Sequence, residues 1–206
     1  MFTRSSRCGP WHALPVTVPK PPPPDATEAT IRARRTSLLV DPHHPVERAV
    51  VERLVELATW APNHKRTWPW RFTVIEGEAR LRFGAALAEA AASGGAPPEK
   101  VAKLPTKYAR SPVVLLAWVA VDADRVRARE DRDAVAAGVQ NLLLGATARG
   151  LASYWASIPD LLVPAARAFS GVDGSHDLVA LVYLGHPTGT VAAPVRPPAP
   201  VTWLDR

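Results

Sequence analysis

The sequence predicts an α+β domain with a full hydrophobic core. Expected helices and strands are mixed along the chain without the strict strand–helix–strand rhythm of a doubly wound parallel sheet. Residues 113–121 are rich in Val and Leu without polar alternation, which is typical of a strand buried on both faces. Residues 133–149 are apolar nearly all round a helix, which indicates burial in the core or at a subunit interface.

The N-terminal half begins with a proline-rich stretch. Residues 1–24 hold seven of the 22 prolines, so we expect a disordered or polyproline-like leader, followed by one domain over residues 25–206. A helix is expected over residues 46–60 because its apolar side chains recur at helical spacing. Further helices are expected at 27–34 and 79–92, and a strand at 71–75, before the turn at Gly77.

The C-terminal half alternates in the same irregular way. A helix is expected over residues 98–109, and its basic face is most often a solvated one. This face consists of Lys100, Lys103, Lys107 and Arg110. Gly150 can end the helix at 133–149 in a left-handed conformation. A strand at 151–158, a helix at 161–169 and a strand at 178–184 follow, and residues 185–206, with five prolines, are expected to form an extended arm.

Composition excludes several classes of protein. With 206 residues, 47% of them hydrophobic, the chain suits one soluble domain. The single Cys8 rules out an internal disulfide framework, and the six His show no ligand spacing, so we expect no metal site. The longest apolar run is too short for a bilayer and no signal pattern precedes it, so a cytoplasmic protein without membrane attachment is expected.

The net charge of +6 is not gathered into a continuous basic stripe. It arises from 25 basic and 19 acidic residues, and half of the excess lies in the leader. Cations scattered at functional loops suit small phosphates better than nucleic acid, so no nucleic-acid partner is expected.

The segment 61–72, Ala-Pro-Asn-His-Lys-Arg-Thr-Trp-Pro-Trp-Arg-Phe, is richer in chemistry than a connection requires. It carries one His, three cations, an Asn and two indoles between an expected helix and an expected strand. Pro62 ends the helix, and Pro69 is expected to hold Trp68 extended. Loops fixed at both ends often carry binding groups. The alternative is a surface turn whose Trp side chains only cap the core.

Familiar catalytic signatures are missing, which favours chemistry carried by an organic cofactor. The sequence has no Gly-x-Gly-x-x-Gly, Walker-type, Gly-x-Ser-x-Gly or His-Glu-x-x-His pattern. A phosphate-bearing cofactor then needs cations and hydroxyls, which Arg34, Arg35 and Thr36 offer at the end of a helix. The alternative is that these arginines only complement the C-terminal dipole of that helix.

Several motifs occur in register over residues 26–204. They are Arg34-Arg35-Thr36, Trp60-Ala61-Pro62-Asn63-His64-Lys65, Pro69-Trp70-Arg71-Phe72, Gln140-Asn141-Leu142-Leu143-Leu144, Ser153-Tyr154-Trp155 and Tyr183-Leu184-Gly185-His186-Pro187. In this order and spacing the chain resembles the FMN-dependent nitroreductase family. It is most similar to the compact NAD(P)H nitroreductases with an APxHK…PW loop.

The resemblance implies a homodimer with FMN at the interface, a mixed or antiparallel sheet flanked by helices, and an exchanged C-terminal arm. Arg34, Arg35 and Thr36 then hold the ribityl chain and phosphate, since arginine grips phosphate oxygens bidentately. Trp60 and His64 contact the flavin, His64 from the partner chain. The segment Trp155, Ala156 and Ser157 runs along the flavin. Arg196 matches a late arginine that binds the phosphate.

The activity that this resemblance implies is transfer of hydride from NAD(P)H through FMN N5 to an electron-poor acceptor such as a nitroaromatic or a quinone. No side chain has to act as a nucleophile, and His64 is assigned to cofactor binding. Two positions depart from the pattern, because Ala156 stands where relatives tend to have Arg, and Trp68 where they tend to have Gln or Glu.

Alternatives to this activity remain open. The same scaffold could carry another flavoenzyme, such as an enoate reductase or a dehalogenase, because function belongs to the site and not to the fold. A non-catalytic flavin-binding dimer is a further alternative, as is a basic module that binds nucleic acid through its leader. The motifs identify neither the acceptor nor the preferred nicotinamide cofactor.

Overall fold

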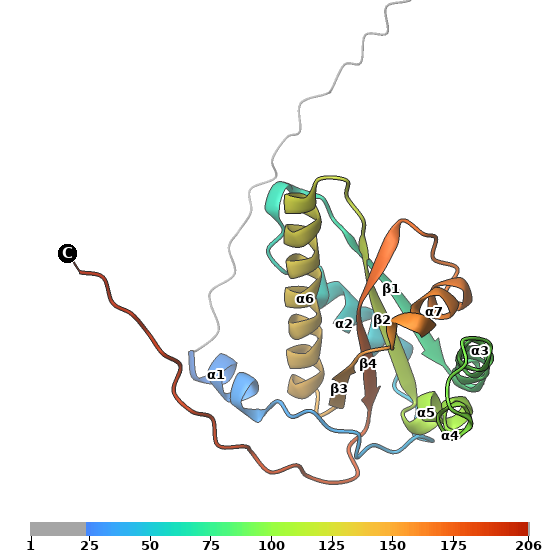
Figure 1. Ribbon diagram of the computed structural model, residues 1–206. Helices are drawn as coiled ribbons and strands as arrows, with labels where there is room; N and C mark the ends of the chain where they lie inside the picture. Colours follow the sequence, from blue (N-terminus) through green and yellow to red (C-terminus); the bar gives the residue numbers. More distant parts are fainter. Residues whose placement is uncertain (1–23, 206) are drawn as a thin grey trace, which may run out of the picture.

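A four-stranded antiparallel sheet with helices on both faces forms the body of the protein (Figure 1). The computed structural model describes residues 24–205, so the expected leader lies outside the described residues except for Pro24. The strand order is β1-β2-β4-β3. The strands are β1 (Trp70–Glu76), β2 (Val113–Ala120), β3 (Ala152–Ala156) and β4 (His176–Gly185). The predicted α+β class is confirmed.

The helices form two layers around this sheet. The α-helices are α1 (Pro24–Ala33), α2 (Arg48–Ala58), α3 (Ala79–Ser93), α4 (Pro98–Val101), α5 (Leu104–Lys107), α6 (Arg125–Ala148) and α7 (Val163–Phe169). Short 3-10 turns are η1 (His64–Arg66), η2 (Tyr108–Arg110) and η3 (Asp160–Leu162). Helices α2 and α6 cover one face, and α3, α5 and α7 cover the other (Figure 1).

Strand β2, one of the two inner strands of the sheet, contributes side chains to both cores. Leu115, Ala117 and Val119 pack with α2 and α6, while the alternate side chains Leu116 and Trp118 pack with α3 and α7. Side chains of a strand alternate between its faces, so a strand covered on both sides is apolar throughout. The prediction of a strand buried on both faces is confirmed.

Helix α6 starts eight residues earlier than the apolar pattern predicts, at Arg125 and not at residue 133. Its N-cap is Asp124, whose Oδ1 accepts hydrogen bonds from the backbone N–H of Val126 at 2.8 Å and of Arg127 at 3.3 Å. The first two turns are polar, so apolar periodicity could not reveal them. Gly150 follows the helix with φ +72°, as the sequence predicts.

The helix expected over residues 98–109 is broken into α4, α5 and η2. The cause is Pro105, which has no N–H for the carbonyl four residues earlier and whose ring would clash there. That carbonyl belongs to Val101, and α4 ends at Val101. The broken segment lies along α3, to which α5 and η2 are closely packed.

The segment after β4 becomes an extended arm, as predicted. Val40 pairs with Pro187, and the backbone N–H of Thr188 donates to the carbonyl of Leu39 at 2.9 Å. From there to residue 205 the chain has no helix or strand, and it runs past α1 (Figure 1). Trp203 and Leu204 are 86% and 90% exposed in the single chain. The arm therefore carries apolar surface that its own domain does not cover.

Candidate functional site

The Arg34-Arg35-Thr36 segment lies beside β3. Thr36 forms a parallel β-bridge with Ser153, and the backbone N–H of Ser37 donates to the Ser153 carbonyl at 2.9 Å. Strand β3 ends at Ala156. The fold thus brings together two motifs that are over 100 residues apart in the sequence.

The two arginines of this segment have different surroundings. Arg34 is half-buried, and its Nη1 donates to Thr36 Oγ1 at 3.4 Å, so these side chains form one polar cluster. Arg35 Nη1 instead donates to the carbonyls of Arg32 at 2.6 Å and Arg34 at 2.9 Å. Arg35 therefore completes the C-terminus of α1, which is the alternative role that the sequence left open.

Unused donors remain next to this cluster. Arg35 Nε and Ser153 Oγ are buried and have no hydrogen-bond partner among residues 24–205. Buried polar atoms are nearly always paired, and an unpaired one needs an explanation such as a ligand. The segment and β3 thus offer polar atoms that suit an anionic, hydrogen-bonding ligand.

A cavity of about 550 Å³ opens over the end of β3, and we call it the Trp155 hollow. Its lining residues are Leu38, Lys107, Arg110, Tyr154, Trp155, Ala156, Ser157 and Tyr183. Three of them, Trp155, Ala156 and Ser157, were predicted site residues. Sequence reasoning missed the others, and the signal for Lys107 and Arg110 was the basic face that we interpreted as solvated.

Lys107 and Arg110 give the Trp155 hollow a positive charge. The Arg110 guanidinium lies 5.6 Å from the centroid of the Tyr183 ring. Burial raises the pKa of the Tyr183 hydroxyl, and Arg110 partly counters this shift. The tyrosine is therefore neutral at physiological pH, and the two basic side chains provide the positive charge.

The loop between α2 and β1 is tied to α6 through a buried carboxylate. Asp131 accepts hydrogen bonds from Asn63 Nδ2 at 3.2 Å and from the Thr67 hydroxyl. Lys65, Arg66 and Trp68 all have left-handed φ, between +52° and +57°. Such backbone is uncommon for residues other than glycine and persists where its surroundings enforce it. The contacts with Asp131 and the three left-handed residues therefore indicate that this loop has a defined conformation.

The backbone conformation of Trp68 differs from the sequence prediction. It was expected to be extended before Pro69, yet its φ is +52°. The Asn63 side chain explains the difference, because its Oδ1 accepts the backbone N–H of Trp68 at 2.9 Å and closes a turn. The local preference imposed by Pro69 is overridden by this contact.

His64 lies far from the Arg34 cluster of its own chain. Its loop contacts α6 at Asp131, near the start of that helix. Ser153, and the Arg34 segment that pairs with it, lie at the opposite end of α6 (Figure 1). Ala148 comes 17 positions after Asp131 in α6, and at a rise of 1.5 Å per residue the two lie about 25 Å apart along the helix. A single chain therefore does not bring His64 and Arg34 to one small ligand.

The two remaining predicted residues lie at the surface. Trp60 is 75% exposed, and its Nε1 donates to Glu56 Oε1 at 2.5 Å. It lines a shallow groove with Thr30 of α1 and Asn141 of α6. Arg196 is exposed in the arm and makes no hydrogen bond or ion pair with residues 24–205.

The described residues offer neither a metal cluster nor a membrane-spanning helix. Within residues 24–205, no three His, Cys, Asp or Glu side chains gather in a way that could hold a metal ion. In the same part of the chain, no helix has the length and apolar character needed to cross a membrane.

Comparison with known proteins gives a consistent result. The model of the Nitroreductase family matches residues 31–186. The protein named Putative NAD(P)H nitroreductase YdjA, from Escherichia coli K12, is 27% identical over 181 residues, covering 87% of this chain and 98% of the relative.

Solved structures share the fold. A nitroreductase-like protein from Bacillus cereus is 26% identical, with a TM-score of 0.74 over 84% of this chain and 91% of its own. The FMN-dependent nitroreductase NfnB from Mycobacterium smegmatis, solved in complex with NADPH, is 20% identical, with a TM-score of 0.67 over 84% and 95% of the two chains. At that identity the second likeness shows the fold alone.

Proposed function

The chain belongs to the Nitroreductase family, and from that premise we propose that it is an FMN-dependent oxidoreductase that uses NAD(P)H to reduce an electron-poor acceptor such as a nitroaromatic or a quinone. The observation that carries the proposal is the bridge between Thr36 and Ser153. It joins a cationic, hydroxyl-bearing segment to a hollow lined by Trp155, and the two together suit a molecule with a phosphate and a flat ring.

The residues present fit FMN. Arg34 and Thr36 would hold the phosphate and the ribityl hydroxyls, and the unpaired Ser153 Oγ and Arg35 Nε lie beside them. When bound, FMN supplies the acceptance of hydride from NAD(P)H and its delivery to the acceptor. Trp155, Ala156 and Ser157 would orient the ring and exclude water from it.

Lys107 and Arg110 add an electrostatic contribution to this site. Both line the Trp155 hollow, where a fixed positive charge favours any negative charge that develops on a bound ring. They stand in for the cation that close relatives tend to carry at the position of Ala156. We therefore expect the protein to bind FMN even though it has Ala156 at this position.

We further infer that the working unit is a homodimer. The loop of His64 contacts α6 at Asp131, about 25 Å along the helix from its C-terminal end by the rise of 1.5 Å per residue, and the Arg34 cluster lies near that end, so His64 would reach a cofactor held by the partner subunit. The arm carries exposed apolar side chains, such as Trp203, that a second copy would cover. Arg196 in that arm would then lie near a phosphate of the assembled dimer.

The experiment that tests the function is an absorption spectrum of the purified protein, followed by anaerobic addition of NADPH or NADH. We expect a yellow protein that bleaches with a nicotinamide cofactor and recolours when a nitroaromatic or a quinone is added. A yellow protein that neither cofactor bleaches would make it a flavin binder without this activity. A colourless protein that takes up no added FMN would overturn the cofactor assignment.

A further inference from the structure

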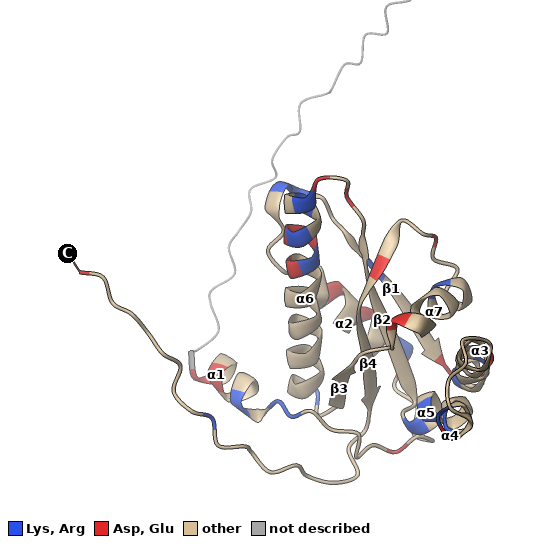
Figure 2. Cartoon of the chain, viewed as in Figure 1, with Lys and Arg blue, Asp and Glu red and all other residues tan. Residues whose placement is uncertain are grey.

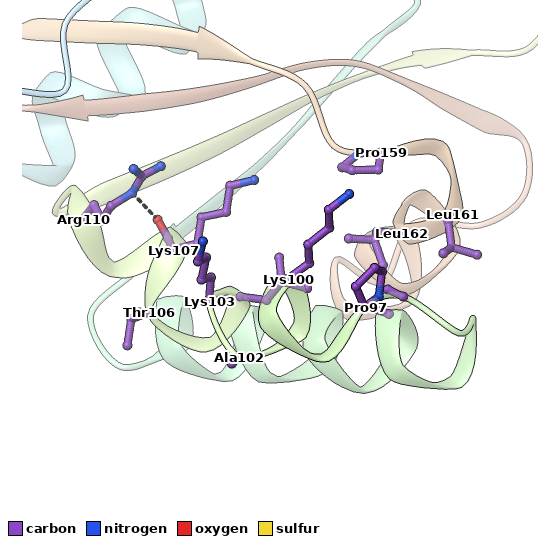
Figure 3. A pocket seen from close by; sticks show the side chains of 13 residues that line it. Pro97, Lys100, Ala102, Lys103, Thr106, Lys107, Arg110, Pro159, Leu161 and Leu162 are labelled. Carbon is purple, nitrogen blue, oxygen red and sulfur yellow. Dashed lines mark hydrogen bonds between the residues drawn. The ribbon is translucent and has the colours of Figure 1, made fainter.

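A second cavity, of about 780 Å³, lies next to the Trp155 hollow, and we call it the lysine cleft (Figure 3). One wall is formed by α4, α5 and η2, and the other by Pro159, Leu161 and Leu162, in and just before η3. Its base is apolar, with Ala91 and Leu104 among its lining residues. A cavity of this size suits a ligand larger than a single aromatic ring.

The polar side chains of the lysine cleft are almost all cationic. Lys100, Lys103, Lys107 and Arg110 line it, and no Asp or Glu does. None of the four forms an ion pair within the part of the chain that the structure describes. Figure 2 shows basic residues on α4 and α5 beside the sheet. The cleft is therefore a pocket of uncompensated positive charge above an apolar base.

The break at Pro105 creates this arrangement. An unbroken helix over residues 98–109 would present its basic face to solvent along a straight line. Because α4 ends at Val101 and α5 starts at Leu104, the chain turns across α3, and the lysine side chains border one cavity (Figure 3). Four like charges held around one hollow repel each other, so an anion bound there would relieve an existing cost.

The lysine cleft and the Trp155 hollow share a border. Lys107 and Arg110 line both of them. Arg110 is held in place because its Nε donates to the carbonyl of Lys107 at 2.9 Å. A molecule that reacts in the Trp155 hollow can therefore extend its unreacting half into the cleft.

We propose that the lysine cleft binds the 2′-phosphate-bearing adenosine of NADPH, which would make NADPH the preferred electron donor over NADH. This inference rests on the proposed function. Of the two nicotinamide cofactors, only NADPH carries a phosphomonoester on its adenosine ribose, and a cluster of ammonium and guanidinium groups suits that dianion. The apolar lining, including Leu104 and Leu161, suits the flat adenine ring.

A binding measurement tests the proposal without relying on activity. Adenosine 2′,5′-bisphosphate and adenosine 5′-monophosphate are titrated into the purified protein by calorimetry. We expect the bisphosphate to bind at least about tenfold more tightly, and its affinity to fall with added salt. Equal affinities of the two nucleotides, or no binding of either, would overturn the assignment.

Single-residue variants test which side chains of the lysine cleft bind the 2′-phosphate. Lys100→Ala and Lys103→Ala remove exposed cations that line the cleft and not the Trp155 hollow, so neither should disturb the fold. Each is expected to raise the KM for NADPH by roughly three- to tenfold, leaving the KM for NADH and kcat unchanged. Arg125→Ala is the matched control, since it removes an exposed cation at the start of α6, outside the cleft.

The remaining outcomes separate this inference from the proposed function. If these lysine variants weaken the binding of a nitrobenzoate acceptor but not the binding of the bisphosphate, the cleft binds an acidic acceptor and the proposal is wrong. If the bisphosphate binds through Lys100 and Lys103 but no nicotinamide cofactor bleaches the protein, the cleft assignment stands and the proposed function fails. If NADH and NADPH reduce the protein equally well in every variant, the function stands and the cleft assignment fails.

Discussion

Asn63, in the loop after α2, donates its side-chain amide to the carboxylate of Asp131 on α6 at a distance of 3.2 Å, across 68 residues of sequence. The Thr67 hydroxyl donates to the same oxygen, and Asp131 is only 3% exposed. A buried carboxylate is stable only where hydrogen bonds satisfy it. This contact therefore fixes the loop that carries His64 to the longest helix of the protein.

Replacing Asp131 with Ala should loosen that loop. Hydrogen bonds to a charged group typically contribute about 1.5–3 kcal/mol, so we expect the free energy of unfolding to fall by roughly that amount. The measurement is denaturant unfolding of the variant beside wild type. Asp133→Ala is the matched control, because Asp133 is exposed on the same helix, and it should change the stability by no more than about 0.5 kcal/mol. Equal losses in both variants would show that the contact has no special role.

The sequence predicts those parts of the fold whose causes are local. The apolar run of β2 and the glycine after α6 were correctly interpreted because periodicity and φ preference act within a few residues. The pairing of Thr36 with Ser153 could not be predicted from the residues alone, since it depends on how the whole sheet is assembled. Pro105 was a local signal for the broken helix, and it was overlooked.

The candidate site also combines residues that the sequence points to with residues that only the fold brings there. The Arg34 and Trp155 motifs were identified by their residues, whereas their neighbours Lys107 and Arg110 join the site only because the helix break and the sheet bring them there. A basic helix face carries no sign of what it will face in the folded protein. Tertiary packing, not residue type, distinguishes a solvated lysine from one that lines a cavity.

Two glycines of α6 should respond differently to a methyl group. A Cβ at Gly138 would lie 2.7 Å from the Ala58 carbonyl oxygen of α2, which is backbone and cannot move alone. A Cβ at Gly145 would meet side-chain ends instead, those of Leu57 and Leu54 at 2.8 and 2.9 Å and that of Arg149 at 3.7 Å. Gly138→Ala should therefore lower the free energy of unfolding by about 1–3 kcal/mol.

Gly145→Ala is the comparison for that effect. Alanine is favoured over glycine in a helix by up to about 1 kcal/mol, and this gain should offset most of the free-energy cost of repacking the two leucines. Thermal and denaturant unfolding of both variants would measure the difference. If Gly138→Ala is as stable as wild type, α2 and α6 are not packed as closely as the structure shows.

Asp173, in the turn before β4, should make stability depend on pH. Hydrogen bonds from the Ser175 hydroxyl, then from the Ser175 backbone and from His176, lower the pKa of this carboxyl from 3.8 to about 2. A folded pKa below the unfolded one stabilises the protein above the unfolded value and is lost as pH falls toward the folded value. The stability difference between wild type and Asp173→Asn should therefore be full at pH 7 and shrink from pH 4 to pH 2.

Ser175→Ala supplies the second variant for this effect. It keeps the carboxyl but removes the largest single contribution to its lowered pKa, while the hydrogen bonds from the backbone of residue 175 and from His176 remain, so the pH dependence should become smaller. The measurement is denaturant unfolding at several pH values between 7 and 2. A difference between wild type and Asp173→Asn that grows on acidification would have the wrong sign and would contradict the assignment.

Arg34 and Arg35 should separate cofactor binding from stability. Arg34 contacts the Thr36 hydroxyl at the polar cluster, whereas Arg35 donates to the carbonyls of Arg32 and Arg34 at the end of α1. Under the proposed function, Arg34→Ala should raise the Kd for FMN by about tenfold or more with unchanged unfolding, since a charge-assisted contact to phosphate is lost. Arg35→Ala should instead lower the free energy of unfolding, by about 1 kcal/mol, because it removes contacts at the C-terminus of α1.

The control for this pair is Arg32→Ala, which removes an exposed arginine of α1 whose partner is Glu28 at 3.7 Å. It should leave FMN affinity and stability near wild type, because exposed ion pairs contribute little. Fluorescence titration of FMN measures the first quantity, and denaturant unfolding measures the second. If Arg34→Ala binds FMN as wild type does while Arg35→Ala does not, the phosphate contact belongs to Arg35, which must then leave the α1 carbonyls when FMN binds. If both bind FMN normally, this segment does not hold the phosphate.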